Sequence, residues 1–370
     1  MMIEIAGCRC WRVGFNAGDK VFWRPRSKFI SFKEPYCEWP ATFRKIVTDK
    51  SITDLVLYGD TREIHQRAIS EARKLNIEVH VFEEGYLRPY WVTYERGGSN
   101  GNSRLMQMPL KQMQSDLTDY DLEAPMPPSH WGDTRQHVFY GALYHWFIMF
   151  ANRAFPHFKP HRDLTVVQEF RLHLRRLLLL PVHAIERKLA TTHIQRGGFP
   201  YHLVLLQLEH DSSLQNASIT ASNGNQDVFD AMLRTAKEDH PNHRIVTKTH
   251  PEAQAGLRRG YFSQNHCRDP NIHLYQKNCS PWALLDGAIA VYTLSSQFGF
   301  EAILHGHRPL IFGQPFYAGW GLSKDIAPPP RRNRKLNAEQ LFMATMMIYS
   351  KWYDPYRDQL CYLERVLDTF

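Results

Sequence analysis

The stretch that decides the fold is Val291-Tyr-Thr-Leu-Ser-Ser-Gln-Phe-Gly-Phe-Glu-Ala-Ile-Leu-His-Gly306. The apolar run from Ala288 to Thr293 is typical of a strand, and the apolar spacing from Phe298 to Leu304 is typical of a helix. Ser295 and Ser296 therefore fall at a strand-to-helix turn. Such a turn gathers backbone N–H groups and the positive end of the helix dipole at one point, which suits a phosphate. Alternatively, the two serines only cap the helix.

Three further strand-like runs, which begin at Asn76, Tyr201 and Arg244, also end in polar residues. Their ends carry Glu83, Glu84, Glu209, Asp211, Lys248 and His250. In open α/β sheets, ligands bind beyond the carboxyl ends of the strands, so these clusters and the serine turn predict one shared site. Because Glu83 and Glu84 are adjacent carboxylates, we expect the pKa of one to rise and that group to act as a general acid or base. Each cluster also has a structural explanation of its own, as a solvated turn or a helix cap.

At these positions the chain resembles the bacterial capsule polysaccharide biosynthesis family, whose β-Kdo transferases build the Kdo linker between a lipid and a capsule. The matching motifs are Phe15-Asn-Ala-Gly-Asp19, Glu84-Gly85, Gln207-x-Glu209-x-Asp211-x-Ser213, Lys248-x-His250-Pro251, Ser295-Ser-Gln-Phe-Gly-Phe-Glu-Ala302 and Phe312-Gly-x-Pro-Phe-Tyr-Ala-Gly-Trp-Gly-Leu322. The resemblance extends over most of the chain. The single-module length is similar to that of the smaller family member, which places the first Kdo on lysophosphatidylglycerol.

The resemblance implies an α/β, GT-B-like fold, in which two Rossmann-like domains face each other across a crevice and a C-terminal helix crosses back. Residues 1–198 are the expected N-terminal, acceptor-side domain, with an inserted helical and loop region at about 95–198. Residues 199–335 are the expected CMP-sugar-binding domain. Residues 336–370 are expected to pack back on the N-terminal domain, with helical spacing from Ala338 to Trp352.

The start of the chain departs from the family pattern. Members usually begin with an apolar strand and a loop containing Gly-Pro before the segment that corresponds to Phe15–Asp19. Only Met1 to Trp11 precede this segment here, so we expect the first strand and its loop to be missing.

The resemblance further implies retaining transfer from CMP-Kdo, in which a carboxylate attacks the anomeric carbon and a second group shuttles a proton. Asp211 is the expected nucleophile and Glu84 the expected acid/base, with Glu83 as the alternative. The residues expected to bind the donor are Lys248, His250, Pro251, Ser295, Ser296, Gly299, Glu301 and Arg88. The residues expected at the loop and crevice are Gln207, Glu209, Phe316, Tyr317, Gly319 and Trp320. Because cations and hydroxyls would stabilise the departing phosphate, no metal or other cofactor is expected.

The composition favours anionic partners, since 45 Lys and Arg residues against 37 Asp and Glu residues give a net charge of +8. No sequence signature of nucleic-acid binding accompanies this charge, so nucleic acid is not an expected partner. The six cysteines lack the spacing of metal ligands, and the sequence shows no signal peptide. Both observations indicate reduced thiols in the cytoplasm.

The segment from Val166 to Leu189 combines basic residues with a leucine-rich face. No apolar run approaches the roughly 20 residues that a membrane span requires. With the lipid acceptor that the resemblance implies, this segment predicts a protein peripheral to the inner face of the cytoplasmic membrane, next to capsule synthesis and export proteins. The alternative is a helix between domains whose leucine face is buried.

Two other functions remain open. A sialyltransferase-like enzyme that uses another CMP-sugar would share the serine turn and the His250-Pro251 pair but need not carry the aromatic run Pro315–Leu322. An inactive membrane-surface subunit of the capsule assembly complex would still bind lipid or partners after both Asp211 and Glu84 are replaced.

Overall fold

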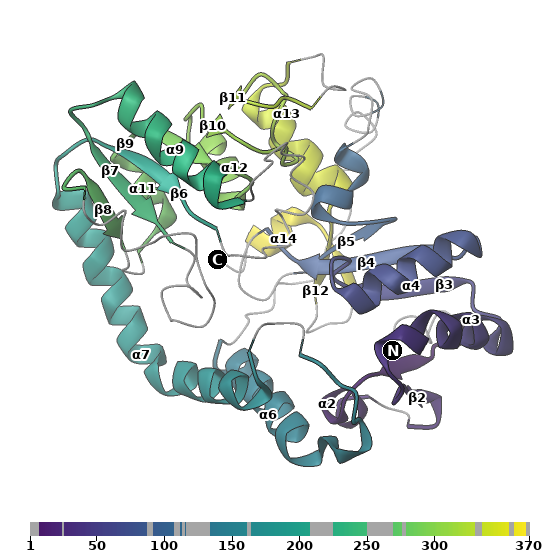
Figure 1. The fold of residues 1–370 in the computed structure, drawn as a ribbon. Coiled ribbons are helices and arrows are strands. Elements are labelled where there is room, and N and C mark those ends of the chain that lie inside the picture. The colour runs from purple at the N-terminus through teal and green to yellow at the C-terminus, as the bar shows by residue number, and fades with distance from the viewer. Residues whose placement is uncertain are drawn as a thin grey trace. The chain divides into compact units, whose positions relative to one another are not determined.

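The structure is a computed structural model, and it describes residues 7–23, 26–86, 92–106, 112, 115, 134–160, 164–207, 225–249, 269–275, 279–329, 335–354 and 359–367. The chain divides into two compact units, whose elements are labelled in Figure 1. Unit 1 comprises Met1–Ser99, Tyr120–Leu179 and Met346–Phe370, and unit 2 comprises Asn100–Asp119 and Leu180–Thr345. The domain boundaries and the GT-B-like pairing expected from the sequence stay predictions.

Unit 2 is built on a six-stranded parallel sheet with the strand order β11-β10-β9-β6-β7-β8. Its strands are β6 (Tyr201–Leu205), β7 (Arg244–Lys248), β8 (Ile272–Tyr275), β9 (Ala288–Thr293), β10 (Leu310–Ile311) and β11 (Lys324–Asp325). The apolar runs in the sequence predicted β6, β7 and β9, because strands buried on both faces are apolar throughout. These three predictions are confirmed.

Helices cover both faces of this sheet. One face packs against α9 (Asn225–Asp239), which contributes Phe229 and Met232 to a core that also contains Val204 and Tyr292. The other face packs against the end of α7 (Val166–Arg196), against α11 (Pro281–Asp286) and against α12 (Gln297–Leu304). Because neighbouring side chains on a strand point to opposite faces, Leu203 lies in the second core and Val204 in the first.

Unit 1 contains a five-stranded sheet with the order β13-β12-β5-β4-β3. Its strands are β3 (Asp54–Tyr58), β4 (Glu78–Glu84), β5 (Val92–Arg96), β12 (Lys351–Asp354) and β13 (Gln359–Cys361). β3 and β4 pair in parallel, while β5 and β12 extend the sheet with antiparallel pairings. The helices α3 (Trp39–Lys50) and α4 (Glu63–Lys74) form a core with this sheet around Trp39, Phe43, Ile69 and Val81.

A short strand directly precedes the Phe15–Asp19 segment, and the expectation that the family's first strand and its Gly-Pro loop are missing stays a prediction. This strand, β1 (Arg12–Gly14), pairs in parallel with β2 (Phe29–Ser31). Its three residues are too few to produce an alternation that can be recognised in the sequence.

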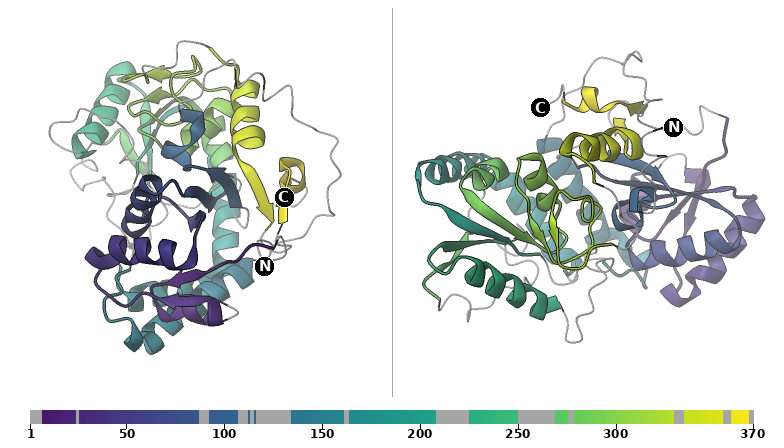
Figure 2. Two further views of the ribbon diagram at one scale, coloured as in Figure 1. Left: turned by 90° about the vertical axis from the view of Figure 1, so that its right-hand side faces the viewer. Right: turned by 90° about the horizontal axis from the view of Figure 1, so that it is seen from above.

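The C-terminal helix predicted over Ala338–Trp352 is shorter than expected. α13 covers Ala338–Met343, a π-helical turn covers Ala344–Tyr349, and the chain then enters β12, as the yellow segment in the left view of Figure 2 shows. The Trp352 side chain is 1% exposed, and its indole N–H donates to the Met346 carbonyl at 2.6 Å. Pairing with β5 and burial of Trp352 thus override the helical spacing, because a short apolar run is compatible with either structure.

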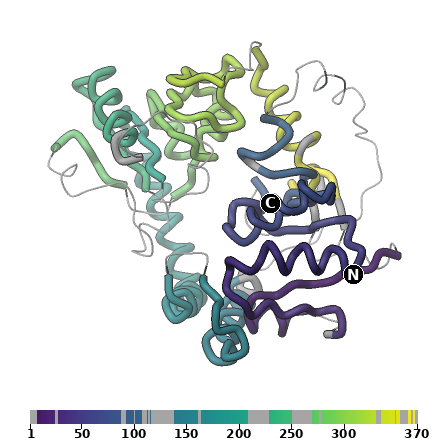
Figure 3. The backbone as a smooth tube through the Cα atoms, turned by 45° about the vertical axis from the view of Figure 1, so that its right-hand side comes forward, coloured from purple at the N-terminus to yellow at the C-terminus, as the bar shows by residue number. Residues whose placement is uncertain are grey.

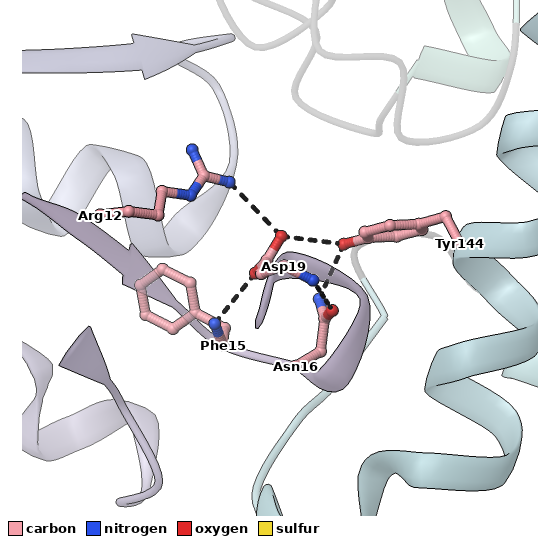
Figure 4. Close-up of polar contacts among 5 residues, drawn as sticks. All are labelled: Arg12, Phe15, Asn16, Asp19 and Tyr144. Carbon is pink, nitrogen blue, oxygen red and sulfur yellow. Dashed lines mark hydrogen bonds and ion pairs between the residues drawn. The ribbon is translucent and has the colours of Figure 1, made fainter. Parts of the chain in front are cut away.

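The Phe15–Asp19 motif is a structural clamp that holds α2 (Ala17–Val21) against α6 (Thr134–Ala151), as Figure 4 shows. The Asn16 side chain accepts from the Asp19 amide at 2.9 Å, and the Asp19 carboxylate accepts from the Phe15 amide at 3.0 Å. The Tyr144 hydroxyl accepts from the Asn16 side chain at 2.8 Å and donates to Asp19 at 3.2 Å. A Cβ atom on Gly18 would lie 2.5 Å from the Tyr144 ring, so the glycine permits this close packing.

The long helix α7 presents apolar side chains to solvent. Leu178, Ile185 and Leu189 are 69%, 62% and 65% exposed, and their spacing of seven and four residues places them on one helix face. The alternative of a buried leucine face therefore does not hold for these residues, although Leu172 is buried. Figure 3 traces α7 in teal. Among the described residues, no helix is both long and apolar enough to cross a membrane.

The remaining elements are short. α14 covers Leu363–Leu367. Single 3₁₀ turns cover Arg26–Lys28, Tyr36–Glu38, Asn100–Asn102, Arg104–Met106 and Asn152–Ala154. The turns at Asn100–Asn102 and Arg104–Met106 lie at the start of the inserted helical and loop region expected at about 95–198, of which residues 116–133 lie outside the described residues.

Candidate functional site

The candidate site is the carboxyl edge of the parallel sheet in unit 2. In the sheet register, Leu205 of β6 lies opposite both Thr293 of β9 and Lys248 of β7. The residues that follow these three adjacent strands therefore meet at one edge. The structure thus brings together Gln207, Lys248 and the serine turn, which the sequence predicted to share a site.

Gln207 fixes the first serine of the turn. The Ser295 amide donates to the Gln207 side-chain oxygen at 3.1 Å, and the Gln207 side-chain nitrogen donates to the Ser295 hydroxyl at 3.2 Å. Both side chains are buried, with Gln207 5% and Ser295 8% exposed. Gln207 therefore positions the turn from the neighbouring strand, which the sequence alone did not indicate.

Ser296 caps α12, as the structural alternative in the sequence predicted. Its hydroxyl oxygen accepts from the Phe298 amide at 3.3 Å, and its own amide donates to the Thr293 hydroxyl at 3.2 Å. Capping does not prevent ligand binding, because a hydroxyl that accepts a hydrogen bond still has one proton to donate. The turn is thus held rigid at the positive end of the α12 dipole.

Gly299 permits close packing beneath this turn. A Cβ atom at Gly299 would lie 2.5 Å from the Tyr317 hydroxyl oxygen and 2.9 Å from the Thr293 methyl carbon. The Tyr317 hydroxyl donates to the Ser296 carbonyl at 2.5 Å, and the Tyr317 side chain is fully buried. Burial raises the pKa of Tyr317, so this hydroxyl keeps its proton for that hydrogen bond.

The aromatic run after β10 forms the support of the site. Phe316 and Trp320 are 8% and 3% exposed, and the Trp320 indole N–H donates to the Phe316 carbonyl at 2.7 Å. The Gly319 amide donates to Asp325 at 2.9 Å, and Gly319 and Gly321 have positive φ values of 79° and 81°, a conformation that favours glycine. The aromatic side chains of this run are buried in unit 2, where the Tyr317 hydroxyl holds the serine turn, and their expected place at a crevice stays a prediction.

Lys248 supplies a partly buried cation at the end of β7. Burial lowers its pKa, while the nearby Cys279 thiol acts in the opposite direction. The Lys248 ammonium lies 5.4 Å from the centre of the Tyr275 ring, and Tyr275 ends the adjacent strand β8. Sequence reasoning missed Tyr275 and Cys279, although the end of β8 carries the same kind of signal as the other strand ends.

In unit 1, Glu83 and Glu84 end β4, and their environments differ. Glu83 is partly buried, and burial, together with the negative charges of Asp60 and Glu84, raises its pKa. The Glu84 amide donates to the Glu83 carboxylate at 3.1 Å, which partly opposes this rise. Glu84 is exposed. One carboxyl of the pair therefore has a raised pKa, as predicted, and this carboxyl belongs to Glu83.

The sequence pattern of the family described as Capsule polysaccharide biosynthesis protein matches residues 53–352. The chain belongs to this family. The match includes all of the strands and turns that form the candidate site in unit 2, and it confirms the resemblance seen in the sequence motifs.

Curated relatives in this family differ in length. The Capsule polysaccharide export protein KpsS of Escherichia coli is 26% identical over 337 residues, which cover 87% of this chain and 82% of that protein. The Capsule polysaccharide modification protein LipA of Neisseria meningitidis serogroup B is 34% identical over 172 residues, which cover 45% of this chain and 24% of LipA. The match therefore spans about a quarter of the length of LipA.

A solved structure shares the fold. The KpsC protein of Thermosulfurimonas dismutans, described as a beta Kdo 2,4 transferase, matches with a TM-score of 0.55 at 18% sequence identity. The match covers 92% of this chain and 90% of that chain. At this identity the likeness concerns the fold, an α/β architecture with parallel sheets.

Several residues of the present chain that the sequence predicted as site residues lie outside the described residues. These are Arg88, Glu209, Asp211, His250 and Pro251. Their expected roles stay predictions. Glu301 lies on α12 within the described part and is partly buried.

Proposed function

We propose that the protein is a retaining β-Kdo transferase that moves Kdo from CMP-Kdo to a lysophosphatidylglycerol-type lipid in the synthesis of the capsule linker. Membership of the capsule polysaccharide family supports this proposal. The fold shared with KpsC, whose description names it a beta Kdo transferase, supports a glycosyltransferase.

The observation that carries the proposal is the carboxyl edge of the sheet in unit 2. There the α12 N-terminus and the Ser296 hydroxyl follow β9, and Lys248 ends β7, so these groups flank the end of β6 in one parallel sheet. The helix dipole and the cation both favour negative charge, and CMP carries a phosphate that gains charge as the sugar departs. Because Lys248 is partly desolvated, its interaction with an anion is stronger than it would be on the surface.

The catalytic roles rest on carboxylates. Asp211 is the proposed nucleophile at the anomeric carbon. Glu83 is the proposed acid/base, because its raised pKa keeps a proton available, and Glu84 is the competing candidate.

Direct transfer tests the function. The purified chain is incubated with a system that generates CMP-Kdo in situ and with a fluorescent lysophosphatidylglycerol, and mass spectrometry is expected to find a product with one added Kdo.

Lys248→Met is expected to weaken CMP binding about 10- to 100-fold, because an interaction between charged groups is lost. Isothermal titration with CMP measures this effect. Lys324→Met, at an exposed position on β11 of the same sheet, is the matched control and should bind CMP as the parent does.

The outcomes of this assay separate the competing functions. Transfer from CMP-sialic acid but not from CMP-Kdo would show a sialyltransferase-like enzyme. Turnover that survives Asp211→Asn would remove Asp211 as the nucleophile. Binding of lipid without any transfer would indicate a non-catalytic subunit, and equal CMP binding by the Lys248→Met variant would exclude the proposed phosphate site.

We further propose that α7 lies on the inner face of the cytoplasmic membrane, where the lipid acceptor is present. Its exposed apolar face contains Leu178 and Ile185, and exposed basic residues, Arg175 and Arg187 among them, lie on the same helix. Apolar side chains that enter the interface and basic residues that attract anionic headgroups together favour such binding.

Vesicle binding tests this placement. The double substitution Leu178→Glu with Ile185→Glu is expected to lower cosedimentation with phosphatidylglycerol vesicles at least about tenfold, because burial of one leucine or isoleucine side chain contributes about 1.5–3 kcal/mol. The control is the single substitution His183→Glu. It adds negative charge at an exposed polar position of the same helix and leaves the apolar face intact. Equal loss of binding in the two variants would show that charge alone, not the apolar face, governs binding.

A further inference from the structure

Three histidines gather at the amino edge of the sheet in unit 2, at the opposite ends of the strands from the candidate site. His202 is the second residue of β6, and His240 and His243 lie in the connection between α9 and β7. One ring nitrogen of each histidine lies within 4.8 Å of the ring nitrogens of the other two. His202 is fully buried, while His240 and His243 are partly buried and accessible to solvent.

A chain of hydrogen bonds behind the cluster determines which nitrogen of His202 carries the proton. The Tyr292 hydroxyl donates to the Asp239 carboxylate at 2.9 Å. With its proton used in this way, the Tyr292 oxygen accepts from Nδ1 of His202, which lies 3.3 Å away. His202 therefore carries its proton on Nδ1, and Nε2 presents a lone pair toward His240 and His243. An imidazole held by a hydrogen bond on its other nitrogen is the arrangement found around metal-binding histidines.

One pair of nitrogens already has the spacing of a tetrahedral metal site, within a cluster whose three ring nitrogens lie within 4.8 Å of one another. Two nitrogens bound to one Zn²⁺ at about 2.0–2.1 Å lie about 3.3 Å apart in a tetrahedral site. Nε2 of His202 and Nδ1 of His243 are already 3.2 Å apart. The imidazole of His240 stacks on His202 with ring centres 4.2 Å apart, so its partly exposed side chain must rotate for its nitrogen to join the other two at one ion. Imidazole nitrogens are ligands that Zn²⁺ prefers.

We propose that His202, His240 and His243 bind one Zn²⁺ ion, with a fourth position open to water. The ion would connect the start of β6 to the connection between α9 and β7. Because this edge is opposite the serine turn, the ion would stabilise unit 2 and would take no part in sugar transfer. The proposal thus concerns a site separate from the donor site, for which no metal is expected.

Zinc binding by the full chain tests the proposal. After treatment with a chelator, the protein is titrated with Zn²⁺ in competition with a chromophoric chelator. We expect one tightly bound Zn²⁺ per chain and a higher midpoint of thermal unfolding when Zn²⁺ is present. His240→Gln and His243→Gln, at partly buried positions, are each expected to abolish this tight binding. His193→Gln, at an exposed position of α7, is the control and should bind Zn²⁺ as the parent does.

A second variant tests the orienting hydrogen bonds without removing a ligand. Tyr292→Phe keeps the buried ring but removes the hydroxyl that holds His202, and it is expected to weaken Zn²⁺ binding about 10- to 100-fold. Circular dichroism establishes that each variant is folded. The proposal is overturned if the parent binds no more Zn²⁺ than His240→Gln and His243→Gln, or if these variants keep stoichiometric binding. In either case the three histidines form only a stacked, hydrogen-bonded cluster.

Discussion

Replacing Gly299 by alanine is expected to destabilise unit 2 by about 1–3 kcal/mol, although alanine favours helices more than glycine does. Gly299 lies in the first turn of α12, where its missing side chain leaves room for Tyr317. The added methyl group would lie 2.5 Å from the Tyr317 hydroxyl and 2.9 Å from the ring carbon that carries it. Real side-chain carbons do not approach other atoms so closely, so Tyr317 must move.

Two opposing effects decide whether the Gly299→Ala substitution raises or lowers the free energy of unfolding. In an exposed helix interior, alanine is more favourable than glycine by about 0.8–1.0 kcal/mol. Overpacking in a close-packed core costs about 1–3 kcal/mol, and displacement of Tyr317 also breaks the hydrogen bond to the Ser296 carbonyl. Because that bond is buried, its loss adds about 1 kcal/mol or more. The steric effect therefore exceeds the helix preference.

Urea unfolding of the parent and the Gly299→Ala variant measures the change. Gly141→Ala provides the matched control, since Gly141 also lies within a helix, α6, and its added Cβ would meet the His173 ring at the milder distance of 3.0 Å. We expect the control to lose less stability than Gly299→Ala. A Gly299→Ala variant at least as stable as the parent would contradict the packing described for Tyr317. The variant should also bind CMP less tightly, because Tyr317 holds the serine turn.

The sequence predicted the carboxyl edge of unit 2 because its strands are buried on both faces. Such strands are continuous apolar runs, and the polar residue that ends each run marks the edge where ligands bind. The rule located the strands Ala288–Thr293 and Arg244–Lys248, and with the first of them the start of α12. The contact between Gln207 and Ser295 could not be predicted, because it depends on which strands are neighbours in the sheet.

The sequence mainly failed to predict contacts between residues that are distant in the chain. His240 and His243 are close in sequence, just before β7, but His202 lies on β6, and the pairing of β6 with β7 brings the three together. The strand β12 was missed for a related reason. Its partner β5 lies far away in sequence, and local helical spacing gave no sign of the pairing that buries Trp352. Local periodicity therefore predicts elements well where they follow local rules, and poorly where long-range pairing decides.

The sequence also could not decide between Glu83 and Glu84. Adjacent residues on a strand point to opposite faces, so one of the two had to be the more buried, but periodicity at the end of a strand does not show which. The structure shows that Glu83 is the partly buried residue with the raised pKa. This difference moves the proposed acid/base role from Glu84 to Glu83.

Glu83→Gln is expected to lower Kdo transfer by about 10²- to 10⁴-fold, the range associated with loss of a general acid or base. The amide is nearly the same size as the carboxyl group but cannot give up or take a proton. In the parent, turnover should be low at acid pH, where Glu83 cannot accept the proton of the acceptor hydroxyl, and should fall again as the pH rises through the pKa of Glu83, because the general acid is then deprotonated. Since burial raises that pKa, the fall occurs at higher pH than for an exposed glutamate. Initial rates of transfer between pH 4 and pH 9, compared in parent and variant, test whether this dependence disappears.

The Glu83→Gln substitution should change stability in the opposite sense to activity. The folded chain holds the Glu83 proton at pH values where the unfolded chain has lost it, so the contribution of Glu83 to stability is lost as the pH rises through its folded-state pKa. Glutamine removes that loss, and Glu83→Gln should unfold at neutral pH with a free energy equal to or above that of the parent. Glu78→Gln, at the exposed start of the same strand, is the control and should change neither quantity. If Glu84→Gln abolishes transfer while Glu83→Gln leaves it intact, the exposed carboxylate is the acid/base, and burial does not select the catalytic group.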